Sequence, residues 1–268
     1  MERNCTFVEN LDDVSRNPSD LMHTYNFMNL IIDQGNSRAK LALFRGTELY
    51  KQVTTNEVNT SAIKLFIAQE RISGVMLSTV KKIPAVTLNH LQSLAERFVL
   101  LSHTTRLPFS LNYRTPETLG MDRIAAVAGA YFAQPKRNIL VIDAGTAITY
   151  DFIDSSAVYR GGNIAPGLEM RLQALHQKTD KLPQVDKNGT VVLLGSDTET
   201  AIRSGVVQGI VFEIEGYIKH LSEECPDLLI FLTGGDTFYF DKRLKNIIFA
   251  DEYLVLKGLN GILQYNAK

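Results

Sequence analysis

Leu30-Ile31-Ile32-Asp33-Gln34-Gly35-Asn36-Ser37 shares its plan with Leu140-Val141-Ile142-Asp143-Ala144-Gly145-Thr146-Ala147, and this repeat decides the fold class. In each stretch an apolar run typical of a buried strand ends in an aspartate, and a glycine follows two residues later. The glycine allows a tight turn whose N–H groups can bind an anion, while the aspartate can hold a cation against that anion. Two such turns facing each other would bind a nucleoside triphosphate with its metal, which predicts a phosphotransferase.

Either aspartate alone could be an ordinary turn residue at the end of a strand, because aspartate is common in turns. Asp33 and Asp143 stand in matching positions of two similar stretches. Agreement between two independent segments favours the ligand-binding interpretation over the structural one.

Composition narrows the classes of function. The chain has 268 residues, is 45% hydrophobic and 21% charged, and carries a formal net charge of −1. These values are typical of a globular protein, and a net charge near zero gives no positive electrostatic field that would attract nucleic acid. No apolar run is long enough for a membrane span, and the two cysteines, Cys5 and Cys225, form no disulfide or metal motif. We therefore expect a reduced, cytoplasmic protein that binds small molecules, with no nucleic-acid or membrane partner.

The pattern of strands and helices predicts an α/β protein with an internal duplication, in which two mixed sheets carry helices on their faces. Residues 1–27 show no periodicity and are expected to be an extension outside the fold, although an ordered arm is the alternative. The halves are predicted at 28–116 and 117–268, with the ligand in the cleft between them. Strands are predicted at 28–33, 39–44, 48–54, 73–78, 98–101, 139–143, 147–153, 158–164 and 228–232.

A third motif, Gly120-Met121-Asp122-Arg123, opens a periodic, alanine-rich helix predicted at 124–132. Asp122 could simply cap that helix, and Arg123 could be a solvated surface charge. In the functional interpretation Asp122 is a general base for an attacking hydroxyl, and Arg123 grips a substrate carboxylate with its planar fork.

Together these motifs resemble the type III pantothenate kinases of the actin/hexokinase/acetate-kinase superfamily. The resemblance runs from Met28 to the C-terminus. An Asp-x-Gly loop alone is shared by many kinases and ATPases, whereas Gly-x-Asp-Arg between two such loops is far more specific. The motifs that carry the resemblance are Asp33-Gln34-Gly35-Asn36-Ser37-Arg38-Ala39-Lys40, Gly120-Met121-Asp122-Arg123, Asp143-Ala144-Gly145-Thr146-Ala147 with Thr149 and Asp151, and Gly161-Gly162-Asn163-Ile164-Ala165-Pro166-Gly167.

The resemblance implies two actin-like (ribonuclease H-like) domains, each with a five-stranded mixed sheet, and ATP-dependent phosphorylation of pantothenate in coenzyme A synthesis. It also implies Mg²⁺ with ATP, a monovalent cation (K⁺ or NH₄⁺), and a homodimer with the active site near the interface. Asp122 would be the proton acceptor, Asp33 would lie near Mg²⁺, and Asp143 would hold the monovalent cation. By motif position, ATP would contact Asp33, Gln34, Gly35, Asn36, Ser37, Arg38, Ala39, Lys40 and Thr146, and pantothenate would contact Tyr113, Gly120, Met121, Asp122, Arg123 and Thr198.

Simpler roles remain open for three of these residues. Lys40 could be an outward-facing strand charge, Tyr113 a packing aromatic, and Thr198 a helix N-cap. Two rival functions also remain: a kinase for another small hydroxy acid, and a non-catalytic regulator built on the kinase fold.

Overall fold

Two mixed sheets and the helices that cover them form the part of the chain that the structure, a computed structural model, describes: residues 27–36 and 38–267. Of the predicted extension 1–27, only Phe27 is among them, and Ser37 lies outside them too. Within this part, no helix has both the length and the apolar character needed to cross a membrane.

The first sheet has five strands in the order β3-β2-β1-β4-β5. The first three strands along the chain are antiparallel neighbours, and the last two run parallel to β1. Helices α2 (Thr60–Ile67) and α3 (Ala85–Ser93) pack on its outer face against a core that includes Leu30, Ile32 and Ile63. The strands are β1 (Phe27–Gln34), β2 (Ala39–Arg45), β3 (Glu48–Thr55), β4 (Arg71–Thr79) and β5 (Arg97–Leu100).

The second sheet repeats this topology and adds one strand, in the order β11-β10-β7-β8-β9-β6. Its strands β7, β8 and β9 are antiparallel neighbours, and β10 and β11 run parallel to β7. The prediction of five strands in this sheet is wrong, because β6 pairs with β9. The strands are β6 (Ser110–Leu111), β7 (Ile139–Ala144), β8 (Ala147–Ile153), β9 (Val158–Pro166), β10 (Leu229–Thr233) and β11 (Phe249–Ala250).

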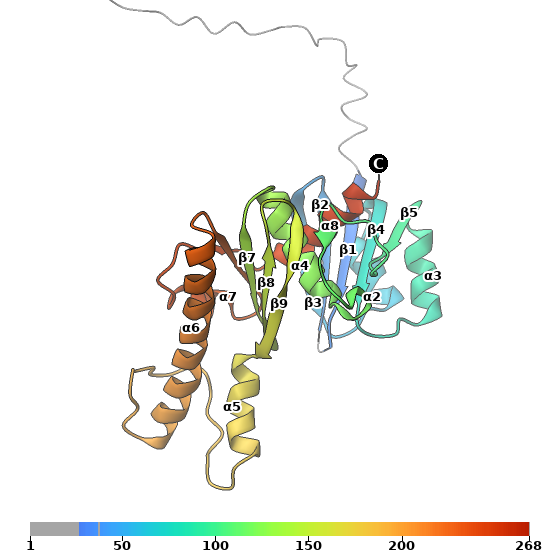
Figure 1. The fold of residues 1–268 in the computed structure, drawn as a ribbon. Coiled ribbons are helices and arrows are strands. Elements are labelled where there is room, and N and C mark those ends of the chain that lie inside the picture. Colours follow the sequence, from blue (N-terminus) through green and yellow to red (C-terminus); the bar gives the residue numbers. More distant parts are fainter. Residues whose placement is uncertain (1–26, 37, 268) are drawn as a thin grey trace, which may run out of the picture.

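Two helices lie between the sheets, and three further α-helices, within residues 168–241, cover the far face of the second sheet (Figure 1). The central pair is α4 and α8, which pack together and against both sheets in one continuous core. The C-terminal helix α8 also contacts β1 and β4 of the first sheet. The central pair has the bounds α4 (Met121–Ala133) and α8 (Leu254–Tyr265). The other helical elements after the first sheet are η1 (Pro116–Thr118), α5 (Leu168–Gln177), α6 (Thr198–Glu224) and α7 (Thr237–Asp241).

Glycines bring the backbones of α4 and α8 into direct contact. A Cβ at Gly258 would collide with the carbonyl oxygen of Ala125, and one at Gly129 would collide with the carbonyl oxygen of Leu254. Because both obstacles are backbone atoms in buried helices, they cannot move aside as a flexible side chain would. The close crossing of α4 and α8 therefore depends on these glycines.

We expect Gly258→Ala to lower the free energy of unfolding by about 1–3 kcal/mol, as overpacking of a core does. The matched control is Gly216→Ala in α6, where a Cβ would meet no atom within 4 Å. That change should raise stability by up to about 1 kcal/mol, because alanine favours the helix. Urea unfolding of both variants measures the difference, and equal effects of the two substitutions would contradict the role of the crossing.

Candidate active site

The two central strands β1 and β7 end in the two predicted anion-binding turns. Asp33 is the penultimate residue of β1, and Asp143 is the penultimate residue of β7. In the first turn, the Gly35 N–H donates to the Arg38 carbonyl at 3.0 Å. In the second turn, the Gly145 N–H donates to the Ala147 carbonyl, also at 3.0 Å. The two similar sequence stretches thus fold into similar strand–turn–strand units, one in each sheet.

Helix α4 begins close to both strand ends and brings Asp122 to them. Gly120 occupies the N-cap position of α4, so Asp122 lies in the first turn and the helix-cap hypothesis is wrong. Its carboxylate accepts a hydrogen bond from the Arg123 N–H at 2.8 Å, and the residue is exposed. The carboxylate is therefore free to meet a substrate.

The three aspartates are close enough for their charges to act on one another. Burial raises the pKa of Asp33, a hydrogen bond from Ser78 opposes this, and the charge of Asp122 adds to the rise. Burial, helped by the charge of Asp122, raises the pKa of Asp143 to about 7, while Lys40 acts in the opposite direction. Clustered carboxylates of this kind repel one another, and bound cations relieve that repulsion.

The raised pKa of Asp143 makes stability depend on pH. An aspartate in the unfolded chain loses its proton near pH 4, whereas Asp143 in the folded protein keeps it up to about pH 7. The folded state then holds more protons, so this residue lowers the free energy of unfolding as the pH rises through that window.

We expect Asp143→Asn to remove this penalty and to stabilise the protein without ligands by about 2–4 kcal/mol at pH 8. The gain should shrink at pH 5, where the folded wild-type carboxyl is already protonated. Urea unfolding at both pH values in choline chloride, which avoids small cations, measures it. A gain that is independent of pH would contradict the burial of an ionisable Asp143.

Arg123 is buried, with 6% of its surface exposed, so the alternative of a solvated surface charge is wrong. Its Nη2 donates to Oδ1 of Asp151 at 2.7 Å, and its Nε donates to the same carboxylate at 3.0 Å. The Tyr159 hydroxyl donates to Asp151 at 2.7 Å and accepts from Nη2 at 3.1 Å. Burial alone would lower the pKa of Arg123, but the bonds and charge of Asp151 raise it above its ordinary value.

A glycine and a second tyrosine complete the surroundings of this buried pair. A Cβ at Gly162 of β9 would come within 2.7 Å of the Arg123 guanidinium. Tyr113 lies beside Tyr159, with ring centroids 6.0 Å apart, and its hydroxyl also acts on Arg123. Gly162 therefore makes room for the Tyr150 carbonyl and for the Asp151–Arg123 pair, a role that the sequence pattern alone did not reveal.

Gly167, which ends the glycine–proline motif, packs against the second turn. Its N–H donates to the Thr146 carbonyl at 3.1 Å, and a Cβ there would collide with the Gly145 and Thr146 carbonyls. Thr146 itself is exposed at the tip of the turn. The motif from 161 to 167 thus supports both Arg123 and the second turn.

Several other predicted residues lie around the first turn. Gln34 is buried and accepts a hydrogen bond from Thr79 at 3.0 Å, while Asn36 and Arg38 are exposed. Ala39 and Lys40 belong to β2, and Lys40 is paired in register with Asp33. The side chain of Lys40 is therefore on the same face of the sheet as Asp33, where its charge reaches both Asp33 and Asp143.

Thr198 is the first residue of α6 and is exposed. The expectation that it caps this helix is wrong, because the N-cap is Asp197, whose side chain accepts from the Thr200 N–H at 2.9 Å. Thr200 completes a capping box with Asp197. In the described part of the chain, no hydrogen bond links Thr198 to the carboxylates.

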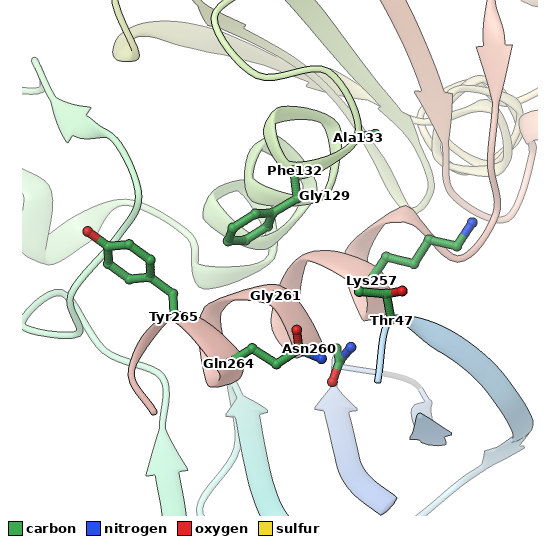
Figure 2. A pocket seen from close by; sticks show the side chains of 9 residues that line it. All are labelled: Thr47, Gly129, Phe132, Ala133, Lys257, Asn260, Gly261, Gln264 and Tyr265. Atoms are coloured by element: carbon green, nitrogen blue, oxygen red, sulfur yellow. The ribbon is translucent and has the colours of Figure 1, made fainter. Parts of the chain in front are cut away.

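A separate pocket of about 380 Å³ opens at the other end of α4, between α4, α8 and the turn after β2 (Figure 2). The side chains of Asn260 and Gln264 on its wall both donate to the Gly46 carbonyl. None of the predicted site residues lines it. It is lined by Thr47, Gly129, Phe132, Ala133, Lys257, Asn260, Gly261, Gln264 and Tyr265.

The His, Cys, Asp and Glu side chains of the described residues do not form a metal-binding group among themselves. Across residues 27–36 and 38–267, no three His, Cys, Asp or Glu side chains gather as a metal-binding group. A Mg²⁺ ion in a kinase normally uses one or two carboxylates together with substrate phosphates and water. The half-buried carboxylate of Asp33 beside an anion-binding turn fits that arrangement.

Sequence comparisons find one family. A family model described as type III pantothenate kinase matches residues 29–220. A Phocaeicola vulgatus protein named type III pantothenate kinase is 49% identical over 241 residues, which cover 90% of this chain and 100% of that protein. A protein of the same name from Azobacteroides pseudotrichonymphae is 45% identical over 245 residues, which cover 90% of this chain and 98% of its own length.

Solved structures share the fold. A Campylobacter jejuni protein described as a conserved Baf family transcriptional activator superimposes with a TM-score of 0.59 at 24% identity, covering 89% of this chain and 98% of that one. A Listeria monocytogenes protein described as an N-acetylmannosamine kinase superimposes with a TM-score of 0.52 at 10% identity, covering 90% and 100%. At these identities the likeness concerns the arrangement of sheets and helices.

Proposed function

The chain belongs to the type III pantothenate kinases, and from this premise we propose how its residues divide the work. Its reaction is the ATP-dependent phosphorylation of pantothenate to 4′-phosphopantothenate, the first step of coenzyme A biosynthesis. The observation that carries the assignment of the site is that the charge of Asp122, on the helix between the sheets, acts on both Asp33 of the first sheet and Asp143 of the second.

The two halves, 28–116 and 117–268, are proposed to be duplicated actin-like domains that face each other across an interdomain cleft. The matching strand orders β3-β2-β1-β4-β5 and β9-β8-β7-β10-β11 support a duplication. The ends of β1 and β7, one from each half, would then lie on opposite walls of that cleft. A cleft of this kind is where ligands bind in two-domain proteins.

The ATP phosphates are assigned to the first turn, residues 33–40, and to Thr146 in the second. The N–H groups of both turns suit phosphate oxygens, and Asp33 is placed to hold the divalent metal against them. When bound, that metal neutralises charge on the transferring phosphoryl group. Lys40, whose charge reaches both aspartates, adds positive charge near the same phosphates.

Asp122 is assigned as the general base. It accepts the proton of the primary hydroxyl of pantothenate as that oxygen forms a bond to the γ-phosphorus and the bond to ADP breaks. An exposed carboxylate in the first turn of α4, between the two phosphate-binding turns, can approach both reactants.

The pantothenate site is assigned to Gly120, Met121 and Arg123 at the start of α4, with Tyr113 as a wall and Thr198 as a further contact. Asp151 and Tyr159 already hold the guanidinium of Arg123 in a fixed orientation. A pre-oriented cation is a suitable partner for the pantothenate carboxylate. Arg123 would therefore bind the pantothenate carboxylate while its guanidinium is held by Asp151 and Tyr159.

A monovalent cation, K⁺ or NH₄⁺, is assigned to Asp143. Among the described residues this carboxylate has no ion-pair partner, although three other aspartates act on it. A bound cation would compensate its charge next to the ATP phosphates.

The protein is proposed to act in the cytoplasm as a homodimer with the active site near the interface. Ile164 supports this assignment, because it is paired in register with Thr149 beside Asp143 and yet is 66% exposed. Apolar side chains that stay in water near a site are candidates for cover by a second subunit.

The two cation assignments can be tested separately through turnover. We expect Asp33→Asn to raise the half-saturating Mg²⁺ concentration at least about tenfold while leaving that for K⁺ within about threefold. Asp143→Asn should show the opposite pattern. The assay follows ADP release with ATP and pantothenate while one cation is varied at constant ionic strength. Equal shifts for both cations in both variants would contradict the division between the two aspartates.

A further inference from the structure

Two threonine hydroxyls flank Asp143, one on each neighbouring strand. Asp143 of β7 is paired in register with Thr149 of β8 and with Thr233 of β10. Residues paired across neighbouring strands have their side chains on the same face of the sheet, and in an antiparallel pair such as Asp143 and Thr149 their Cβ atoms are about 4.5–5.5 Å apart. The three side chains therefore form a row on the face that α4 covers.

Both hydroxyls are buried without a partner. Oγ1 of Thr149 and Oγ1 of Thr233 have no hydrogen-bond partner among the described residues, and Thr233 is 0% exposed. Leaving a buried hydroxyl unsatisfied costs about 1–3 kcal/mol, so two at one place are unusual in a stable protein. Their position beside a carboxylate indicates that the row is built for something that contacts all three oxygens.

The charges around the row indicate that its ligand is a cation. Asp33, Asp122 and Asp151 all act on Asp143, and of these Asp151 is already paired with Arg123. Lys40 acts on Asp143 from β2 but forms no ion pair with it in the described chain. An anion at this place would be repelled by four carboxylates, whereas a cation would be attracted.

The number of charged groups in the row indicates the charge of the bound cation. The row offers one carboxylate and two neutral hydroxyls, while divalent ions such as Ca²⁺ and Mg²⁺ bind mainly carboxylates, phosphates and water. A single negative ligand with neutral oxygens suits a cation of charge +1. Gly234 leaves room for the Asp143 carboxylate, because a Cβ there would collide with its Oδ1.

We propose that Thr149 and Thr233 are ligands of a monovalent cation that Asp143 binds, so that the three strands β7, β8 and β10 form one cation site. The proposal rests on the assignment of a monovalent cation to Asp143 made above. It adds the two residues that would select a weakly hydrated ion over a divalent one.

Thermal unfolding without ATP or pantothenate tests the proposal independently of turnover. The full chain is heated in increasing KCl, with choline chloride holding the ionic strength constant. A ligand that binds only the folded state stabilises it by RT ln(1 + [L]/Kd), so the unfolding temperature starts to rise when the K⁺ concentration passes Kd and then keeps rising with its logarithm. We expect such a rise for the wild type, a fitted Kd for K⁺ at least about tenfold higher in Thr149→Val and in Thr233→Val, and no rise in the double variant.

Three controls make the result specific. Thr149→Ser and Thr233→Ser keep the oxygen, so their fitted Kd for K⁺ should stay within about threefold of the wild type. Thr60→Val removes another buried hydroxyl without a partner, in α2, and should leave the K⁺ response unchanged. Thallium-205 NMR with Tl⁺ in place of K⁺ reports the same site directly, and the bound signal should disappear in the double variant.

Valine variants that lose stability equally with and without K⁺ would overturn the proposal, because the hydroxyls would then only support Asp143. A wild type that phosphorylates pantothenate but shows no K⁺-dependent rise would also overturn it, while leaving the kinase assignment intact. A wild type that shows the K⁺ response but does not phosphorylate pantothenate would support the cation site and contradict the kinase assignment.

Discussion

Asp122→Asn should lower kcat for phosphorylation of pantothenate at least about a hundredfold and leave the fold unchanged. Positioned general bases contribute about 10²–10⁴-fold to a rate, and asparagine cannot accept the proton of the attacking hydroxyl. Asp122 is exposed in the first turn of α4, and its recorded hydrogen bond is to the neighbouring Arg123 N–H. An amide oxygen can accept that bond equally well, so stability should change little.

The measurement is ADP release at saturating ATP and pantothenate, with calorimetric titration of both ligands as the control for binding. We expect the dissociation constant of ATP to stay within about threefold of the wild type. Glu117→Gln, which neutralises another exposed acid, on η1 just before α4, is the matched control and should retain full activity. Wild-type turnover in Asp122→Asn would move the base to another residue.

Arg123→Met should lower the free energy of unfolding by about 3–5 kcal/mol, because it leaves the carboxylate of Asp151 buried without its partner. Asp151 is 0% exposed, and its remaining donor is the Tyr159 hydroxyl. For a protein of this size the loss corresponds to a fall in unfolding temperature of roughly 10 °C.

The double variant Arg123→Met/Asp151→Asn should be more stable than the sum of the single changes predicts, because it removes both charges of the pair. The matched control is Arg137→Met, which breaks the surface pair with Asp227 whose nitrogen and oxygen are 3.8 Å apart. Surface pairs contribute at most about 1 kcal/mol, so this control should change stability little. Additive effects at Arg123 and Asp151 would contradict a coupled buried pair.

The sequence predicted the strands that position the site. Apolar runs that end at Asp33 and Asp143 became β1 and β7, within a residue or two of the predicted limits. Such long buried runs fix their own position, because shifting them would expose their apolar side chains. The strands that the pattern missed, β6 and β11, contain two residues each and are too short to show any periodicity.

The partners of Arg123 could not be read from the pattern. Asp151 is 28 residues away in the sequence and Tyr159 is 36 away, and only the packing of α4 on the second sheet brings them together. One signal was available: Asp151 sits two residues after Thr149 on β8, so both face the same side as Asp143. Alternation along a strand can group such residues, but it cannot say which one an arginine on a helix will meet.

The most direct test of the account is to identify the product of the purified chain by phosphorus-31 NMR. The protein is incubated with ATP, Mg²⁺ and K⁺, and with pantothenate and glycerate at equal concentration. We predict one new phosphomonoester signal, that of 4′-phosphopantothenate, in a one-to-one ratio with ADP and absent in Asp122→Asn. Phosphoglycerate as the main product would indicate a kinase for another hydroxy acid, and binding of both substrates without any phosphomonoester would indicate a regulator; either result would contradict the account.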